Sequence, residues 1–391
     1  MERANPKRNA MLPYGKQHID NDDIAAVIQV LRSELITQGP AIEKFESKIA
    51  DYVGAKYAVA FSNGTAALHG ACFAAGISPG DEVITTPITF LASSNCVMYV
   101  GGTPVFADIK SDTYNIDPEQ IEAKISKKTR AIIAVDFTGQ PVEIDRINEI
   151  AQKNNLIVIQ DAAHSLGAEY DGRKVGALAD MTMFSFHPVK HITTGEGGVI
   201  VTNDEEYYNK LVLFRSHGVT RNPELMRQND GPWYYEMIDL GYNYRMTDLQ
   251  AALGISQMDK LVRFVEKRRH IAKNYNDAFR DMSGLIIPFQ HSRALSSWHL
   301  YVLGWKPEAF KADRKMIFES MRAENIGVHV HYIPIHKQPY YRDLGYGEQS
   351  YPNAESYYEI SISLPIFPSM DAEDVEHVIQ AVKRIYNQYF K

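Results

Sequence analysis

Short apolar runs rich in β-branched residues alternate with longer stretches of helical spacing from about residue 20 onward. In the stretch 143–155, for example, Ile144, Ile147 and Ile150 fall on one helical face. Such alternation predicts an α/β fold with a mainly parallel central sheet covered by helices on both faces. The predicted strands are YAVAF (57–61), EVITT (82–86), TPVFAD (103–108), RAIIAVDF (130–137), LIVIQD (156–161), MTMFSF (181–186) and GGVIVTN (197–203).

The alternation fades after a long helical pattern at 246–262. Beyond it lie isolated strand-like pieces at 298–305 and 327–335, and a closing helix that begins at Asp371. We therefore expect a second, smaller α+β domain at the C-terminus. The expected division is a flexible N-terminal tail over residues 1–10, a large domain over 11–265 and a small C-terminal domain over 266–391.

Composition excludes several classes of protein. The 391 residues carry a net charge of −7, which gives no long-range attraction to nucleic acid or to an anionic membrane. Cys72 and Cys96 have no CxxC spacing, so they predict neither a disulfide framework nor a zinc site. The N-terminus has no apolar segment of the kind found in secretory signals, and no apolar run has the length of a membrane span. We expect a cytoplasmic protein without nucleic-acid or membrane partners.

Ligands of parallel α/β sheets bind beyond the carboxyl ends of the strands. The stretch SNGTAALHG (62–70) directly follows a predicted strand. Gly64 allows close backbone approach, and Thr65 can open the following helix, whose N-terminus favours a phosphate. Taken alone, the same residues are also typical of an ordinary strand–helix turn with a threonine cap.

A second polar position ends the predicted strand 156–161. Asp161 is expected to be buried there, and burial of a carboxylate without a partner is costly. Asp161 therefore caps a helix, pairs with a cation or binds a ligand. His164 follows three residues later.

The stretch FSFHPVKHITTGEGG (184–198) places a single lysine, Lys190, among apolar, small and hydroxyl residues. Ser185 lies near the end of the preceding strand. A desolvated lysine has a lowered pKa and becomes a nucleophilic amine. The alternative is a structural lysine whose amine reaches solvent.

Together these positions fit pyridoxal phosphate (PLP). This cofactor needs a lysine to hold it as an imine and an acid that keeps its ring nitrogen protonated, so that the ring acts as an electron sink. Lys190 and Asp161 supply these two groups. Gly64 and Thr65 with Ser185 would hold the phosphate, and Phe90, in TTPITFLASSN after another strand, would stack on the ring.

From Leu12 to the C-terminus the chain resembles the DegT/StrS-type family of PLP-dependent nucleotide-sugar aminotransferases. The resemblance implies the fold of aspartate aminotransferase, which is fold type I of PLP-dependent transferases. The motifs that carry the resemblance are LITQGPAIEKFE, SNGTAAL, TTPITFLASSNCV, QDAAHSLGAEY, FSFHPVKHITTGEGG, FRSHG, LGYNYRMTDLQAALG and VHVHYIPIH.

The resemblance implies a role for each matching residue. Lys190 is expected to be the Schiff-base lysine, Asp161 the partner of the ring nitrogen, and His164 the neighbour of the ring oxygen. Asn243, in GYNYR, is expected to reach the cofactor phosphate of a neighbouring subunit, which implies a homodimer with shared active sites. Cofactor contacts are further expected from Gly64, Thr65, Phe90 and Ser185. Substrate contacts are expected from Tyr14, Glu34, Leu35, Ile36, Thr37, Gly64, Ser185, Asn243, His331, Tyr332, Ile333 and Pro334.

Within the family the resemblance points to the pseudaminic acid pathway. The implied reaction moves an amino group from glutamate, through pyridoxamine phosphate (PMP), to C4 of a UDP-linked 2-acetamido-2,6-dideoxy-4-keto-hexose. The alternative is a different 4-keto or 3-keto nucleotide sugar, as in the UDP-bacillosamine, perosamine or other dTDP- and GDP-sugar pathways. Some family members carry histidine at the lysine position and act as dehydratases, so Lys190 favours transamination.

Histidines raise two further questions. His329, His331 and His336 invite a metal site, but no carboxylate or cysteine ligand lies nearby in the sequence, so we expect no metal. His191 stands where the family pattern has proline. It could perturb the neighbouring imine or face solvent, and we expect it to face solvent.

Overall fold

The computed structural model describes residues 10–391, and the N-terminal tail expected over residues 1–10 lies outside them except for its last residue. Its centre is a seven-stranded sheet with the order β1-β9-β8-β5-β4-β2-β3. All neighbours are parallel except β9, which runs antiparallel to β1 and β8. The mainly parallel sheet is therefore confirmed. Its strands are β1 (Tyr57–Phe61), β2 (Glu82–Thr85), β3 (Thr103–Phe106), β4 (Thr129–Val135), β5 (Ile157–Asp161), β8 (Met181–Ser185) and β9 (Gly198–Thr202).

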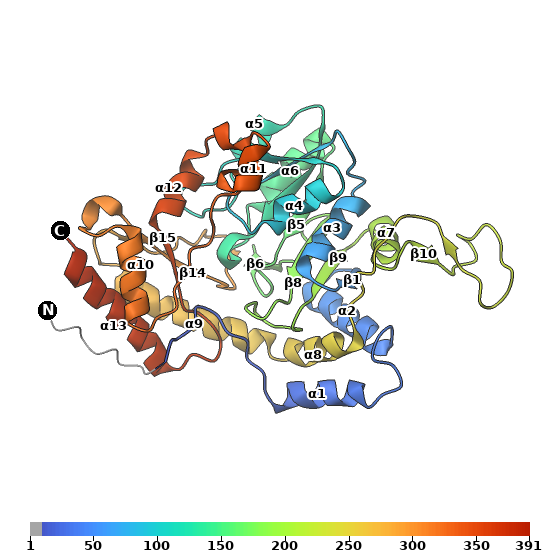
Figure 1. Ribbon diagram of the computed structural model, residues 1–391, viewed down its shortest axis with the longest axis horizontal. Helices are drawn as coiled ribbons and strands as arrows, with labels where there is room; N and C mark the ends of the chain where they lie inside the picture. Colours follow the sequence, from blue (N-terminus) through green and yellow to red (C-terminus); the bar gives the residue numbers. More distant parts are fainter. Residues whose placement is uncertain (1–9) are drawn as a thin grey trace.

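Helices cover both faces of this sheet (Figure 1). Alternate residues of each strand serve the two faces, as the period of a pleated strand requires. In β4, Ala131 and Ile133 pack toward one helical layer, whereas Ile132 and Ala134 pack toward the other. The first layer holds α3 (Gly64–Ala74), α4 (Ala92–Tyr99) and α7 (Glu205–Arg215), and the second holds α2 (Pro40–Val53), α5 (Pro118–Lys124), α6 (Ile144–Asn154) and α8 (Asp248–Met258).

The single helical pattern expected over 246–262 is wrong, because two helices occupy this region. α8 ends at Met258, and α9 begins at Leu261 and continues to Phe279. At the junction the buried Lys260 forms ion pairs with Asp20 and Asp23, at the start of α1 (Asn21–Leu31). Because these partners come from the far N-terminus, no local pattern signals the break.

The C-terminal part packs a three-stranded antiparallel sheet against helices around its own core. Its last helix starts directly after Asp371, which caps it in a capping box with Asp374. The elements of this part are β12 (Leu285–Ile286), β14 (Tyr301–Trp305), α10 (Arg314–Ala323), α11 (Pro339–Asp343), α12 (Pro352–Ile360), β15 (Ser361–Leu364) and α13 (Ala372–Tyr389), with short 3-10 turns at Pro307–Ala309, Ile335–Lys337 and Tyr346–Glu348.

The strand-like piece expected at 327–335 does not form a strand. It pairs with the sheet edge only where His329 bridges Ser363. The chain then leaves the sheet and crosses to the large domain, where Ile335 N donates to Pro87 O (2.9 Å). This course carries His331 and Tyr332 toward the carboxyl ends of the central strands.

Helix α9 contributes to both cores. Leu261 and Val265 pack with the large-domain layer, whereas Ile271, Tyr275 and Phe279 pack in the C-terminal core. The expected division at residue 265 thus falls inside a continuous helix. We propose that α9 is the element that the two domains share.

Two small sheets complete the fold. One is the hairpin of β10 (Val219–Thr220) and β11 (Glu236–Met237), which projects from the body of the molecule (Figure 1). The other joins β6 (Glu169–Tyr170), β7 (Arg173–Lys174) and β13 (Ala294–Leu295). None of the helices over residues 10–391 has the length and apolar character of a membrane span.

Candidate active site

Two adjacent parallel strands bring polar side chains to the same edge of the sheet. β5 ends at Asp161 and β8 ends at Ser185. Lys190 follows β8 in a tight loop, where its backbone N donates to His187 O (2.9 Å). A hydrogen bond from Thr194 N to Phe186 O (3.1 Å) closes the loop before the chain enters β9. Ordinary strand geometry therefore places the predicted acid and the predicted lysine at one end of the sheet.

The turn before α3 packs against this edge. A Cβ at Gly64 would lie 3.3 Å from Ser185 Oγ, so the turn and the end of β8 are in contact. A Cβ at Gly198 would lie 2.6 Å from Asn63 O, which explains one of the crowded glycines after Lys190. The helix cap is Asn63, whose side chain accepts from Ala66 N (2.9 Å), so the alternative of a threonine cap at Thr65 is wrong. Thr65 lies inside the first turn of α3.

Asp161 is buried, with 4% of its surface exposed. Its carboxylate accepts hydrogen bonds from Ser93 Oγ (2.6 Å) and Ala163 N (3.2 Å). Burial raises the pKa of Asp161, while these hydrogen bonds and the Lys190 charge lower it. Within the described part of the chain no lysine or arginine forms an ion pair with this carboxylate. The site thus contains an acid without a directly bonded cation.

Lys190 ends in a desolvated amine. Its pKa is lowered to about 8, chiefly by burial; the charge of Asp161 opposes this shift, and the charge of Arg268 adds to it. At pH 7 a pKa of about 8 leaves roughly a tenth of the amine uncharged, against about one part in three thousand at the ordinary value. The amine is therefore a nucleophile and a base at neutral pH.

Three buried histidines lie near enough to this amine for its charge to act on them. The ring of His299 lies 4.3 Å from that of His164 and 5.6 Å from that of His191, measured between centroids. Burial lowers the pKa of all three imidazoles well below its usual range. They are therefore neutral groups that do not add charge beside Lys190.

His191 does not face solvent, so that expectation is wrong. Only 3% of its surface is exposed, and its Nε2 lies 3.2 Å from Ser297 O. The loop after Lys190 turns the ring beneath the segment that precedes β14. That segment also supplies His299, which sequence reasoning missed, although a histidine near the start of the strand-like piece 298–305 was a usable signal.

The C-terminal domain closes the site from the other side. Tyr332 Oη lies 3.3 Å from His164 Nε2, and the ring of Tyr14 lies 5.3 Å from that of His331. His331 Nδ1 is 2.8 Å from Ser363 Oγ. The structure therefore brings Tyr14, His331 and Tyr332 together beside His164. Ile333 is 46% exposed and Pro334 is buried.

Phe90 lies at the mouth of the site. It is 58% exposed, and its ring centroid is 6.1 Å from that of Tyr332. Ser93, whose hydroxyl binds Asp161, donates its backbone N–H to Phe90 O (3.3 Å). An aromatic ring so exposed next to a buried acid is available to stack on a ligand.

Other predicted residues lie elsewhere in the single chain. Thr37 bridges Thr247, and Asp248 N donates to Ile36 O (3.1 Å), so the segment 34–37 lies against the start of α8. Asn243 is exposed, and its backbone bridges Ser216. In the described part of the chain, no hydrogen bond or ion pair joins these residues to Lys190, Asp161 or His164.

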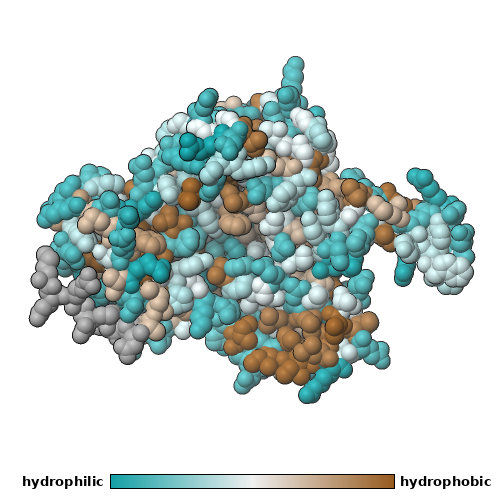
Figure 2. All heavy atoms as spheres, in the orientation of Figure 1, coloured by the Kyte–Doolittle hydropathy of each residue, from teal (hydrophilic) through white to brown (hydrophobic). Residues whose placement is uncertain are grey.

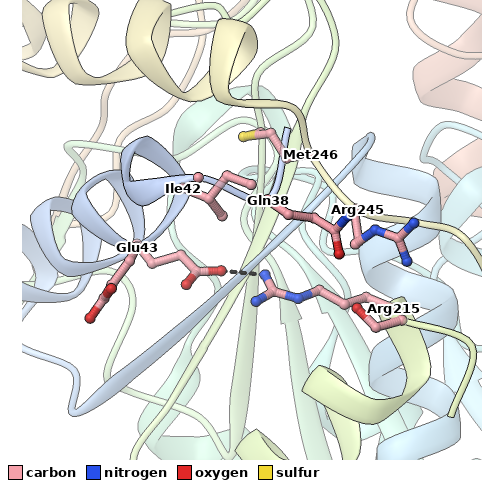
Figure 3. Close-up of a pocket in the computed structure, with 9 residues that line it drawn as sticks. Gln38, Ile42, Glu43, Arg215, Arg245 and Met246 are labelled. Carbon is pink, nitrogen blue, oxygen red and sulfur yellow. Dashed lines mark hydrogen bonds and ion pairs between the residues drawn. The ribbon is translucent and has the colours of Figure 1, made fainter. Parts of the chain in front are cut away.

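Next to these residues lies a pocket of about 240 Å³ (Figure 3). Arg215 and Arg245 both line it, and Glu46 forms an ion pair with Arg215. It shares no lining residue with the Lys190 site. Its walls are formed by Gln38, Gly39, Ile42, Glu43, Glu46, Arg215, Ser216, Arg245 and Met246.

A second buried acid escaped sequence reasoning. Asp136 follows β4 and accepts hydrogen bonds from Gln160 Nε2 (2.9 Å), Ser165 Oγ (2.5 Å) and Val142 N (2.9 Å). Burial raises its pKa to about 7. The signal was present, because the predicted strand 130–137 contains Asp136 near its end, just as the strand 156–161 ends at Asp161.

Over residues 10–391 no group of three histidine, cysteine or acidic side chains could hold a metal ion.

Comparison with known proteins matches residues 17–383 to the DegT/DnrJ/EryC1/StrS aminotransferase family. The chain is 43% identical to the spore coat polysaccharide biosynthesis protein SpsC of Bacillus subtilis, over 97% of this chain and 98% of that one. It is 40% identical to the UDP-4-amino-4,6-dideoxy-N-acetyl-beta-L-altrosamine transaminase of Campylobacter jejuni, over 94% and 96%. Among solved structures it resembles Helicobacter pylori PseC, an aminotransferase involved in the biosynthesis of pseudoaminic acid, with a TM-score of 0.90, 34% identity and coverage of 97% and 100%.

Similar solved structures include PLP and PMP forms, and the residues of this site fit that cofactor. Over residues 10–391 no cation is bonded to Asp161, as a partner for a protonated ring nitrogen requires, and no hydrogen-bond partner reaches the buried His164 Nδ1. The start of α3 meets Ser185 where a phosphate would be bound. With a match that spans nearly its whole length, the chain belongs to the DegT/DnrJ/EryC1/StrS aminotransferase family, whose members are PLP-dependent enzymes that act on sugar nucleotides.

Proposed function

We propose that the protein transfers an amino group from glutamate to C4 of a UDP-linked 2-acetamido-2,6-dideoxy-4-keto-hexose. The product would be UDP-4-amino-4,6-dideoxy-N-acetyl-β-L-altrosamine, for pseudaminic acid biosynthesis. The observation that carries amino transfer is the desolvated Lys190 amine at the same sheet edge as the buried Asp161. The sugar assignment is supported by relatives named as this transaminase, which are 35% to 40% identical to the chain.

In this proposal Lys190 holds the cofactor covalently and later acts as the base. When bound, PLP supplies the electron sink that lets an amino group pass from donor to acceptor. Lys190 Nζ removes the proton from the donor's α-carbon, and it delivers a proton to sugar C4 in the second half-reaction. Because its pKa is near 8, the amine can both accept and release a proton at neutral pH.

Asp161 and its neighbours would orient the cofactor ring. The Asp161 carboxylate is fixed by Ser93 Oγ and Ala163 N, and it would hold the proton on the ring nitrogen. Phe90 offers an exposed aromatic face for stacking, and His164 would lie beside the ring oxygen. The phosphate would lie at the start of α3, against Gly64, Thr65 and Ser185, where the helix dipole favours an anion.

The sugar nucleotide would enter between the two domains. Tyr14, His331 and Tyr332 present aromatic and imidazole groups beside His164. The segment Glu34–Thr37 lies apart, against the start of α8, and would contribute contacts to the site of a second subunit.

We also propose that the working unit is a homodimer with shared active sites. Apolar side chains gather over α1, as Figure 2 shows, and Ile24, Ile28 and Leu31 are 38% to 57% exposed. On the projecting hairpin, Trp233 is 72% exposed. Exposed apolar side chains that gather in one place are typical of an interface between subunits. Asn243, exposed next to the base of this hairpin, would reach the cofactor phosphate of the second subunit.

In the direct test, purified enzyme, PLP and glutamate are mixed with each of a panel of UDP- and dTDP-4-keto sugars. The products are identified by mass spectrometry and NMR. The proposal expects turnover of the UDP sugar and amination at C4 with formation of 2-oxoglutarate. If only dTDP sugars react, the pseudaminic acid assignment is wrong, while sugar-nucleotide amination stands.

A second candidate is an aminotransferase for another 4-keto or 3-keto nucleotide sugar. The observation that favours it is the 43% identity to SpsC, which is higher than the 40% identity to the Campylobacter jejuni transaminase. The same panel separates the two, because pocket shape decides between sugar isomers.

A further inference from the structure

The two ring nitrogens of His164 have different surroundings. Nε2 lies 3.3 Å from Tyr332 Oη, whereas Nδ1 is buried and has no partner in the described part of the chain. Burial lowers the pKa of His164 well below its usual value, so the ring is neutral and carries one proton. Whichever nitrogen holds this proton decides whether Nδ1 donates or accepts a hydrogen bond.

The ring is held in place from several sides. The His299 ring packs 4.3 Å away, and Ser297 Oγ donates to the backbone carbonyl of His164 (2.9 Å). The Phe137 ring lies at 6.2 Å. Because His164 is 5% exposed, solvent does not compete for either nitrogen. The direction in which Nδ1 points is therefore set by the fold.

The chemistry of the pair favours one arrangement. An unprotonated imidazole nitrogen is a much better acceptor than a phenol oxygen, and a phenol is a good donor. Burial raises the pKa of Tyr332, so its hydroxyl stays protonated at neutral pH. The bond therefore runs from Tyr332 O–H to His164 Nε2, which leaves the proton of the imidazole on Nδ1.

We propose that Tyr332 is a positioning residue that donates to His164 Nε2 and thereby directs an Nδ1–H donor at the anionic ring oxygen of the cofactor. This inference rests on the proposed function, since it takes the ligand of His164 to be the PLP ring. Tyr332 was expected only to contact substrate. Its hydroxyl acts instead through His164, so its loss alters the cofactor rather than the sugar.

The test uses Tyr332→Phe, which removes one hydroxyl and keeps the ring that packs beside Phe90 and Phe137. The control is Tyr275→Phe, which removes another buried hydroxyl, bonded to Pro365 O (2.9 Å) and distant in sequence from the site. Each protein is labelled with ¹⁵N-histidine, and the His164 signals are assigned by their loss in His164→Gln. Nitrogen chemical shifts then report the tautomer with and without PLP, and the dissociation constant for PLP is measured by fluorescence.

We expect the Nδ1–H tautomer in the wild type and in Tyr275→Phe. In Tyr332→Phe without PLP, the His164 tautomer should shift toward Nε2–H. The dissociation constant for PLP should rise about five- to tenfold, as loss of one hydrogen bond predicts. A wild-type His164 with its proton on Nε2, or a Tyr332→Phe protein with unchanged tautomer and affinity, overturns the inference.

Failure of the proposed function is recognised separately. Borohydride reduction of the PLP-loaded wild type, followed by digestion, labels the peptide around Lys190 if that residue holds the cofactor. An unlabelled Lys190 rejects the proposed function. A labelled Lys190 together with an unchanged His164 tautomer rejects only the role of Tyr332.

Discussion

At the scale of single residues, the site holds the ammonium group of Lys190 in a desolvated environment. Lys190 has a pKa of about 8 against an ordinary 10.5, mainly because its amine is buried. Below pH 8 both the folded and the unfolded chain hold the proton, so folding bears the full cost of desolvating the ammonium. Between pH 8 and 10.5 that cost declines, because the folded state is already neutral. The catalytic amine therefore destabilises the cofactor-free protein at neutral pH.

This cost predicts that Lys190→Met stabilises the cofactor-free protein. We expect a gain of about 1–3 kcal/mol in the free energy of unfolding at pH 7, which shrinks as pH rises from 8 toward 10.5. Urea denaturation at several pH values measures it. Lys48→Met is the control, since Lys48 forms an exposed ion pair with Asp259 (2.6 Å) and should show little change. Equal effects of the two substitutions would contradict a buried Lys190 amine.

Asp161 opposes this effect, since its negative charge raises the pKa of Lys190. Asp161→Asn should therefore move the pH midpoint of Lys190 amine labelling in the cofactor-free protein downward from near 8, by about one unit for charges in partial contact with solvent. Reductive methylation followed by mass spectrometry of the Lys190 peptide measures the midpoint. Asp145→Asn, on an exposed carboxylate, is the matched control. An upward shift in Asp161→Asn would show that the two groups do not interact as the structure implies.

At the scale of elements, the site depends on how closely the turn before α3 approaches β9. Gly198→Ala would place a methyl group 2.6 Å from Asn63 O and 2.8 Å from Gly64 Cα, where only backbone atoms can move. We expect a loss of about 1–3 kcal/mol in stability, as overpacking usually costs, and PLP binding at least tenfold weaker because the phosphate turn shifts. Thermal unfolding and PLP titration measure the two effects.

Gly347→Ala is the control for this substitution. Its methyl group would meet the flexible side chain of Arg342 at 3.0 Å, so the neighbour can move aside. Unchanged PLP affinity in Gly198→Ala would show that the turn does not depend on this contact.

Local patterns were sufficient for the elements that carry the site. Each of the predicted strands of the large domain forms within a few residues of its expected bounds, because β-branched runs in a parallel sheet are buried on both faces. The ends of β5 and β8 then bring Asp161 and Ser185 to the same edge of the sheet. A carboxylate or lysine in an apolar setting is conspicuous in a sequence, and so these residues could be predicted.

Features set by distant partners could not be predicted in this way. The break between α8 and α9 depends on Lys260 and on Asp20 and Asp23, far away in the chain. The burial of His191 depends on the carbonyl of Ser297. The segment 327–335 reads as a strand but crosses to the large domain, which a periodic pattern does not reveal.

At the scale of the whole molecule, the single chain leaves several predicted site residues apart from the Lys190 amine. Asn243 is exposed near the base of the hairpin that carries Trp233, and the segment 34–37 lies against α8 beside the exposed face of α1. These residues share one property, since each lies next to an exposed apolar surface. A two-fold dimer that buries these surfaces would present them to a second subunit.

Complementation between defective subunits tests whether the sites are shared. Lys190→Ala removes the reactive amine, and Asn243→Asp sets a carboxylate against the proposed phosphate position, so each homodimer should be inactive. The two variants are co-expressed with different affinity tags, and hybrid dimers are isolated by two purification steps, one for each tag. If Asn243 acts on the partner's cofactor, each hybrid contains one intact site, and its turnover should be about half that of the wild type. If Asn243 acts within its own subunit, both sites carry a defect and the hybrid stays inactive.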